Sequence, residues 1–231
     1  MKNMVRFTLC AVLLLATLAP PLGFSGSPCF NSFSHVHAAP NKDKGKPWHS
    51  DIVNLKGTRG NDNITAYDQL NTQVRAFSGD DFIDLSEAGG QNYVDAGSGN
   101  DYVKDSPFYD TIRLGDGDDV TTHTGGNDII SGDRGNDSFE IYVDQVFSAP
   151  DPPYDVGGPF VTQIDGGDDV DTIKFFMSQE YIDAGYKDAI IEAFESWQQT
   201  DPTEDLDLNT ITTPLNIILS SIEHLKIVNI P

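Results

Sequence analysis

The stretch LGDGDDVTTHTGGNDIISGDRGNDSF (114–139) decides which fold this chain can adopt. Asp119, Asp128 and Asp137 are nine residues apart in it. Each of them follows glycine-rich sequence and an Asn or Asp residue. Glycine and asparagine tolerate the positive φ angles of tight turns, so the pattern predicts a turn at every ninth residue.

The same unit recurs from Gly57 to about Ile141, with nine to eleven residues between successive turn positions. The residue two positions further on is apolar in every unit except one, where Thr121 stands, and we expect Val120 to replace it. Each unit therefore joins a turn to a short strand with one apolar face. The turn positions are Asp62, Thr72, Asp81, Asn92, Asp101, Asp110, Asp119, Asp128 and Asp137.

Short strands at this spacing predict a mainly β fold, a parallel solenoid of Gly/Asp-rich nonapeptide repeats rather than a sandwich of hairpins. Two units form one coil of about eighteen residues, so alternate units lie on opposite edges. On one edge, all five units have glycine two residues before the acid and Asn or Asp just before it. On the other edge only the unit ending at Asp128 keeps this full pattern.

An acid in every coil on one edge creates an electrostatic problem. Equivalent turns of a stacked coil are about 4.8 Å apart, and carboxylates that close repel one another. Calcium resolves this, because it accepts six to eight oxygens from carboxylates and backbone carbonyls, whereas Mg²⁺ requires strict octahedral geometry. The alternative is a series of solvated acidic turns without metal. Five acids in phase favour several bound Ca²⁺ ions.

Four units carry a resemblance to a known family: AGSGNDYVK (96–104), LGDGDDVTT (114–122), GDRGNDSFE (132–140) and GTRGNDNIT (57–65). They resemble the repeat GGxGxDxUx of RTX (hemolysin-type) calcium-binding proteins, and GGDDVDTIK (166–174) is a later copy. The resemblance implies a parallel β-roll that binds calcium between successive turns and folds when calcium is present. The side-chain ligands that it implies are Asp62, Asp81, Asp101, Asp119, Asp137 and Asp171, with Asp128 paired with Asp110 on the weaker edge. It also implies carbonyl ligands around Gly60, Gly99, Gly117 and Gly135.

The N-terminus has the features of an export signal. Lys2 and Arg6 precede an apolar run over 7–20 that is short for a membrane span. Val36 and Ala38 offer a cleavage site, which predicts a signal peptide over 1–39; an earlier cut and an uncleaved anchor are the alternatives. We therefore expect a secreted, extracellular protein without a membrane span after signal removal. The periplasm and the cell surface are alternative locations.

Composition changes divide the rest of the chain. We expect a polar linker over 40–50, the calcium-binding β-roll over 51–143 and a proline-rich inserted loop over 144–163. The last repeat, a capping helix and short C-terminal strands are expected over 164–231.

The expected helix covers 183–200, because apolar residues recur there on one face. We expect Asp183 to cap its start and the Asp-Pro pair at 201–202 to end it. Its place after the repeats suggests that it covers the open end of the solenoid. The apolar face consists of Tyr186, Ile190, Phe194 and Trp197.

The composition and the missing motifs limit the possible functions. With 36 acidic and 14 basic residues the formal net charge is -22, the opposite of what a nucleic-acid-binding protein needs. The sequence has no H-E-x-x-H and no G-x-S-x-G motif, so we predict no enzyme. We interpret His49, His123 and His224 as ordinary surface or turn residues.

Two functions remain in view. The first is an exported calcium-binding protein with a structural or adhesive role, whose partners are calcium and cell-surface or extracellular-matrix components. The second is a carbohydrate-active enzyme, a lyase or hydrolase on the same scaffold, with Arg75, Lys104 and Arg113 in one groove. The direction of these three side chains discriminates between the two functions.

Overall fold

The computed structural model describes residues 34–37 (as backbone), 52–67, 71–148, 161–210 and 215–231. The chain divides into two units, Met1–Phe30 and Asn31–Pro231, and all described residues belong to the second. Strands make up 47% of the described residues and helices 16%, so the fold is mainly β, as predicted. The predicted signal peptide and linker fall largely outside the described residues, although β1 (Ser34–His37) lies within the segment predicted as signal.

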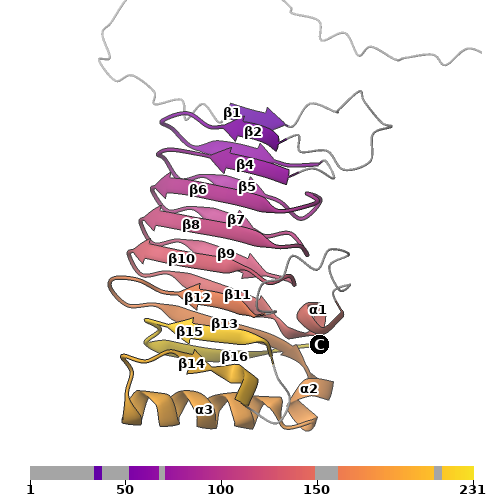
Figure 1. Cartoon of the computed structure of the whole chain (residues 1–231), viewed down its shortest axis with the longest axis vertical. Coiled ribbons are helices and arrows are strands. Elements are labelled where there is room, and N and C mark those ends of the chain that lie inside the picture. Colours follow the sequence, from indigo (N-terminus) through magenta and orange to yellow (C-terminus); the bar gives the residue numbers. More distant parts are fainter. Residues whose placement is uncertain (1–33, 38–51, 68–70, 149–160, 211–214) are drawn as a thin grey trace, which may run out of the picture. The chain divides into compact units, whose positions relative to one another are not determined.

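Successive strands from β1 to β13 alternate between two eight-stranded sheets, which Figure 1 shows stacked along one direction. The first sheet has the order β1, β3 (Asp62–Thr65), β5 (Phe82–Asp84), β7 (Tyr102–Lys104), β9 (Val120–His123), β11 (Ser138–Tyr142), β13 (Thr172–Ser178) and β16 (His224–Ile230). The second sheet has the order β14 (Leu206–Asp207), β15 (Ile217–Ser220), β12 (Thr162–Asp165), β10 (Ile129–Arg134), β8 (Asp110–Asp116), β6 (Asn92–Ser98), β4 (Asn71–Arg75) and β2 (Ile52–Lys56).

Strand pairing follows the repeat. All neighbouring strands are parallel except β14 and β15. Val94 of β6 pairs with Ile112 of β8, which in turn pairs with Ile130 of β10. Equivalent residues of every second unit therefore lie side by side, which confirms the predicted parallel sheets.

The apolar position of each unit faces the core. Ile64, Ile83, Val103 and Ile112 have no exposed surface. The expectation for the polar unit was wrong, because Thr121 is buried at 1% exposure whereas Val120 is only half-buried. Thr121 pairs in register with Val103 and Phe139, both inward-facing, so the two-residue period of the strand turns Val120 outward.

Glycines are required in the turns because successive turns touch there. Gly99, Gly117 and Gly135 have positive φ angles of 123°, 142° and 123°. A Cβ atom at Gly117 would collide with the carbonyl group of Gly99, and one at Gly135 with that of Gly117. These positions exclude other residues for two independent reasons, backbone conformation and space.

The stack continues across the segment predicted as an inserted loop. That segment starts in helix α1 (Val143–Ser148) and ends in β12, and residues 149–160 lie outside the described part. The C-terminal strands β15 and β16 pair in parallel with β12 and β13, so they extend both sheets.

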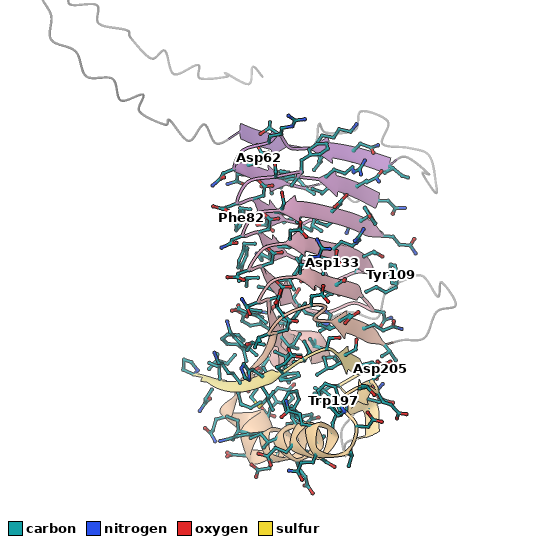
Figure 2. All side chains as sticks on the ribbon, turned by 90° about the vertical axis from the view of Figure 1, so that its left-hand side faces the viewer. Asp62, Phe82, Tyr109, Asp133, Trp197 and Asp205 are labelled. Atoms are coloured by element: carbon teal, nitrogen blue, oxygen red, sulfur yellow. The ribbon has the colours of Figure 1, made fainter. Side chains whose placement is uncertain are left out.

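Helices lie at the C-terminal end of the stack (Figure 1). They are α2 (Gln179–Asp183), α3 (Tyr186–Thr200) and the 3-10 helix η1 (Leu208–Thr210). Helix α3 buries Ile190, Phe194 and Trp197 as predicted, and Figure 2 shows Trp197 between the helix and the strands. The predicted cap was wrong: Asp183 is the last residue of α2, and Gly185, with a φ of 93°, precedes α3. Among the described helices, none is both long and apolar enough to cross a membrane.

Candidate metal-binding edge and a buried histidine

The structure brings six of the predicted ligands into one row, which we call the acidic edge. From the second member onward, each carboxylate accepts a hydrogen bond from the backbone N–H of the preceding member of the row, whereas the first, Asp62, accepts from Thr58. The donor–acceptor distances along the row are 2.6–2.8 Å, and Glu223 accepts the last of these bonds from Asp171. All six members are buried at 2% exposure or less. They are Asp62, Asp81, Asp101, Asp119, Asp137 and Asp171.

In five of these carboxylates only one oxygen has a hydrogen-bond donor among the described residues. Oδ1 accepts the backbone N–H of the neighbouring turn. In Asp62 both oxygens accept, from the backbone N–H and the hydroxyl of Thr58. Within the described part of the chain, Oδ2 is buried without a hydrogen-bond partner in five of the six. A buried acceptor without a partner costs about 1–3 kcal/mol, and a proton or a cation beside Oδ2 would offset that cost. The five are Asp81, Asp101, Asp119, Asp137 and Asp171.

Burial also makes these carboxyl groups hard to ionise. Desolvation is the main cause that raises the pKa of Asp101 to about 8; neighbouring carboxylates act in the same direction, and the backbone hydrogen bond from Asp81 opposes them. The same desolvation raises the pKa of Asp81 to about 7 and that of Asp119 to about 6. For Asp137 and Asp171 the pKa is about 7. A cation beside the row would instead stabilise the charged form.

Backbone oxygens lie beside the free carboxylate oxygens. A Cβ atom built on Gly132 would come closer than 3.0 Å to both Asp137 Oδ2 and the carbonyl oxygen of Gly166. The same arrangement recurs at Gly166, between Asp171 Oδ2 and the carbonyl oxygen of Ser221. Glycine therefore lets a carboxylate oxygen and a carbonyl oxygen approach the same point of the backbone, and these two oxygen types are the donors that a hard cation prefers.

These carbonyl groups were not identified from the sequence. It pointed to Gly60, Gly99, Gly117 and Gly135, and the carbonyl groups of Gly99 and Gly117 face the α-carbon of the next glycine in the stack. The carbonyl of Gly60 accepts a 3.3 Å hydrogen bond from the Thr58 hydroxyl. One sequence feature could have pointed to the carbonyls of Gly166 and Ser221. It is the glycine at the first position of the units that begin at 57, 132 and 166.

The opposite edge is built differently. It consists of Thr72, Asn92, Asp110, Asp128 and Thr162, and here side chains supply donors as well as acceptors. Asn92 Nδ2 donates to Asp110 Oδ1 (2.7 Å), and the backbone N–H and hydroxyl of Ser106 donate to Asp110 Oδ2 (2.9 and 2.8 Å). The predicted partners Asp110 and Asp128 do meet, through the backbone N–H of Asp110 and Asp128 Oδ1 (2.8 Å). However, both oxygens of Asp110 are already hydrogen-bonded.

A cluster inside the molecule was not predicted. His123, read from the sequence as a surface or turn residue, is buried at 1% exposure because the register of β9 turns it inward. Its Nδ1 lies 3.1 Å from Asp105 Oδ2 and 2.8 Å from Asp128 Oδ2, and both aspartates are fully buried. Only the contact with Asp105 has hydrogen-bond geometry, so Asp128 Oδ2 has no hydrogen bond. This Asp105–His123–Asp128 group could hold a metal ion.

The two carboxylates govern the protonation of the ring. Burial by itself lowers the pKa of His123, but the hydrogen-bonding and charge effects of Asp105 and Asp128 outweigh it and raise the pKa to about 10. Without a metal, the ring therefore carries its proton at neutral pH. The pKa of Asp105 is raised, because desolvation exceeds the effect of the histidine.

The three basic residues of the enzyme hypothesis are divided between the two sheets. Arg75 (β4) and Arg113 (β8) belong to the second sheet and Lys104 (β7) to the first. Each is exposed and lies beside an acid of its own: Asp95 at 3.4 Å, Asp133 at 2.8 Å and Asp84 at 4.0 Å. They do not form the common groove that the hypothesis required.

Comparisons of the chain with family models, with curated proteins and with solved structures found no match. The function of the chain is therefore inferred from the geometry of the acidic edge and of the buried cluster.

Proposed function

We propose that this protein is an exported calcium-binding β-roll of the RTX type, with a structural or adhesive role and with folding coupled to extracellular calcium. The observation that carries the proposal is the row of buried Oδ2 atoms without hydrogen bonds along the acidic edge. Their regular recurrence argues for several ions rather than one.

Charge supplies the thermodynamic reason for coupling. Several ionised carboxylates in one buried row repel one another, and without a cation this repulsion and the burial favour proton uptake, against the backbone hydrogen bonds. A divalent cation between successive turns would hold Asp101 and Asp119 charged and would offset their repulsion. Its binding free energy would then be folding free energy, because the row forms only when successive turns stack.

The oxygen-only donor set favours calcium. Carboxylate and carbonyl oxygens converge at Gly132 and Gly166, and calcium accepts such mixed sets at variable geometry. The proposed side-chain ligands are the five aspartates of the acidic edge whose Oδ2 has no donor among the described residues. The carbonyls of Gly166 and Ser221 are added to the set. Asp62 and Asp110 are left out because both oxygens of each are already hydrogen-bonded.

The first test is a calcium titration of the purified chain, followed by far-UV circular dichroism, with magnesium as the control. We expect a cooperative gain of β signal with calcium and little gain with magnesium. A chain that is fully folded in chelator and unchanged by calcium would refute the proposal.

Two adjacent aspartates provide a matched pair of variants. Asp119→Asn retains an oxygen for the backbone N–H of Asp101 but removes the charge of the buried carboxylate. Asp118→Asn removes an equal charge from an exposed side chain that binds Asn136 in the next turn. We expect a large rise in the calcium midpoint only for Asp119→Asn. Equal effects would mean that net charge, and not a site, controls folding.

A further inference from the structure

We propose that Asp105, His123 and Asp128 form a second metal site inside the molecule, for a first-row transition-metal dication of the zinc class. It is separate from the calcium ions proposed for the acidic edge. The cluster belongs to the first sheet and the opposite edge, and its ligands include nitrogen.

The cluster interrupts an otherwise apolar row of the core. Inward positions of the first sheet carry Ala66, Leu85, Ile141 and Phe175, all fully buried. Between them, at the equivalent places, stand Asp105, directly after β7, and His123, the last residue of β9. Apolar residues fill the other positions of this row. Core packing therefore does not explain why two titratable residues stand in its middle.

The two carboxylates are held in place from behind. Asp105 Oδ1 accepts from the hydroxyl of Thr124 (2.9 Å), and the backbone N–H of Thr124 is shared between Oδ1 and Oδ2 of Asp105 (3.2 Å to each). Asp128 Oδ1 accepts from the backbone N–H of Asp110. Both Oδ2 atoms are thereby directed at His123 Nδ1, as outer hydrogen bonds orient the ligands of metal sites.

The other ring nitrogen indicates which histidine tautomer fits a metal. Thr162 Oγ1 lies 3.4 Å from His123 Nε2, accepts from the backbone N–H of Asp128 (3.2 Å) and donates to the carbonyl of Gly126 (3.4 Å). A hydroxyl has one proton, so the proton between Thr162 and His123 belongs to Nε2. Nδ1 then faces two carboxylate oxygens and needs a positive group there, either a proton or a metal ion.

Charge balance favours the metal ion. A proton on Nδ1 neutralises one of two fully buried carboxylates, and Asp110 adds another buried carboxyl group nearby. A dication bound by neutral histidine neutralises both Asp105 and Asp128. Tetrahedral zinc ligands lie about 3.4 Å apart, so shifts of a few tenths of an ångström from 2.8 and 3.1 Å would suffice. The nitrogen ligand argues against calcium and magnesium, which prefer oxygen.

The test uses zinc alone as probe, added to the full chain in saturating calcium after treatment with chelator. We expect wild type to retain one more zinc ion per chain than His123→Asn, which keeps a small polar group near the Nδ1 position. His224→Asn, which changes an exposed histidine, should retain as much zinc as wild type. Equal zinc content in His123→Asn and wild type, with both folded by circular dichroism, would overturn the proposal.

A second measurement uses only wild type, so it tests the proposal even where His123→Asn does not fold. In ¹⁵N-labelled wild type, zinc should shift the Nδ1 resonance of one buried imidazole while its Nε2 stays protonated. An imidazole that keeps protons on both nitrogens at saturating zinc would identify an imidazolium bridge between two carboxylates, and the proposal would be wrong. The calcium titration is independent of both results.

Discussion

The two edges of this molecule both bind the backbone N–H groups of successive turns, but they do so with different side chains. Both place polar side chains beside the start of the repeat strands, and on both edges oxygens of these side chains accept the backbone N–H of the preceding turn, as in Asp101, Asp119, Asn92 and Asp128. On the acidic edge every such residue is an aspartate, and the second oxygen is left without a donor in five of them. On the opposite edge, Asn92 and Ser106 donate to Asp110.

The difference shows that the turn position requires a hydrogen-bond acceptor but does not require a negative charge. The backbone requires an acceptor at each turn, and Asn92 Oδ1 meets that requirement as well as a carboxylate does. Negative charge is an addition to this structural role. The proposed cation binding depends on this addition, a carboxylate at every step with a second oxygen that has no donor among the described residues in five of six.

The largest expected effect is a pH dependence of the acidic edge without calcium. Carboxyl groups with a pKa of about 6 to 8 in the fold and near 3.8 when unfolded bind more protons in the folded state. Stability in chelator should therefore be greatest at low pH and decrease as pH rises from about 4 to about 8. Urea unfolding at pH 5 and pH 8 measures this. Calcium should remove most of the loss, and equal stability at both pH values in chelator would contradict the raised pKa values.

The next prediction compares one carboxylate from each edge. Asp101→Asn should raise the calcium midpoint by roughly tenfold or more, because charge and ligand number set calcium affinity. Asp110→Asn should leave the midpoint within about twofold, because its oxygens serve Asn92 and Ser106, although stability can fall by about 1–3 kcal/mol. Isothermal calorimetry gives the calcium affinities. A midpoint shift for Asp110→Asn as large as that for Asp101→Asn would erase the distinction between the edges.

A third change converts the opposite edge locally to the acidic type. Asn92→Asp keeps the acceptor for the backbone N–H of Thr72 but removes the amide that donates to Asp110. We expect a loss of about 1–3 kcal/mol in chelator from the lost donor and the new repulsion. Calcium should restore part of that stability. A loss that calcium does not reduce at all would mean that this edge cannot accept an ion even with the acid in place.

The smallest effect is expected on the outer face of the second sheet. Arg75 and Asp95 lie 3.4 Å apart, with side-chain exposures of 53% and 31%. Arg75→Gln should cost less than about 1 kcal/mol, because exposed ion pairs contribute little. Thermal unfolding in calcium measures the change. A cost comparable to that of Asn92→Asp would mean that burial is not what makes charge important in this fold.

Much of the fold could be predicted from the sequence, because the repeat fixes which residues face inward. Ile64, Ile112 and Phe139 are buried as the nine-residue period requires, and the apolar face of α3 is buried as predicted. The six aspartates of the acidic edge were also identified, since glycine and acid recur there in phase.

The remaining features depend on contacts that a repeat pattern does not encode. The period gives the position of Asp137 but not which of its oxygens accepts the backbone N–H of the preceding turn. His123 was misread because the first position of a unit varies between Gly132, Ala96 and Leu114, so its inward direction carries no compositional signal. The register of β9 with Val103 and Phe139 decides both Thr121 and His123.

The hydrogen bonds of the acidic edge all point the same way along the chain. The amide of Asp62 uses the carboxylate of Asp81, and so on to Asp171, whose amide uses Glu223 near the C-terminus. Each turn is thus completed by the turn made after it. During synthesis from the N-terminus, the newest turn always has an unmet amide until the last residues have been added. The direction of these bonds therefore follows the order of synthesis. A chain that stops after Asp137 would leave the backbone N–H of Asp137 without the carboxylate of Asp171.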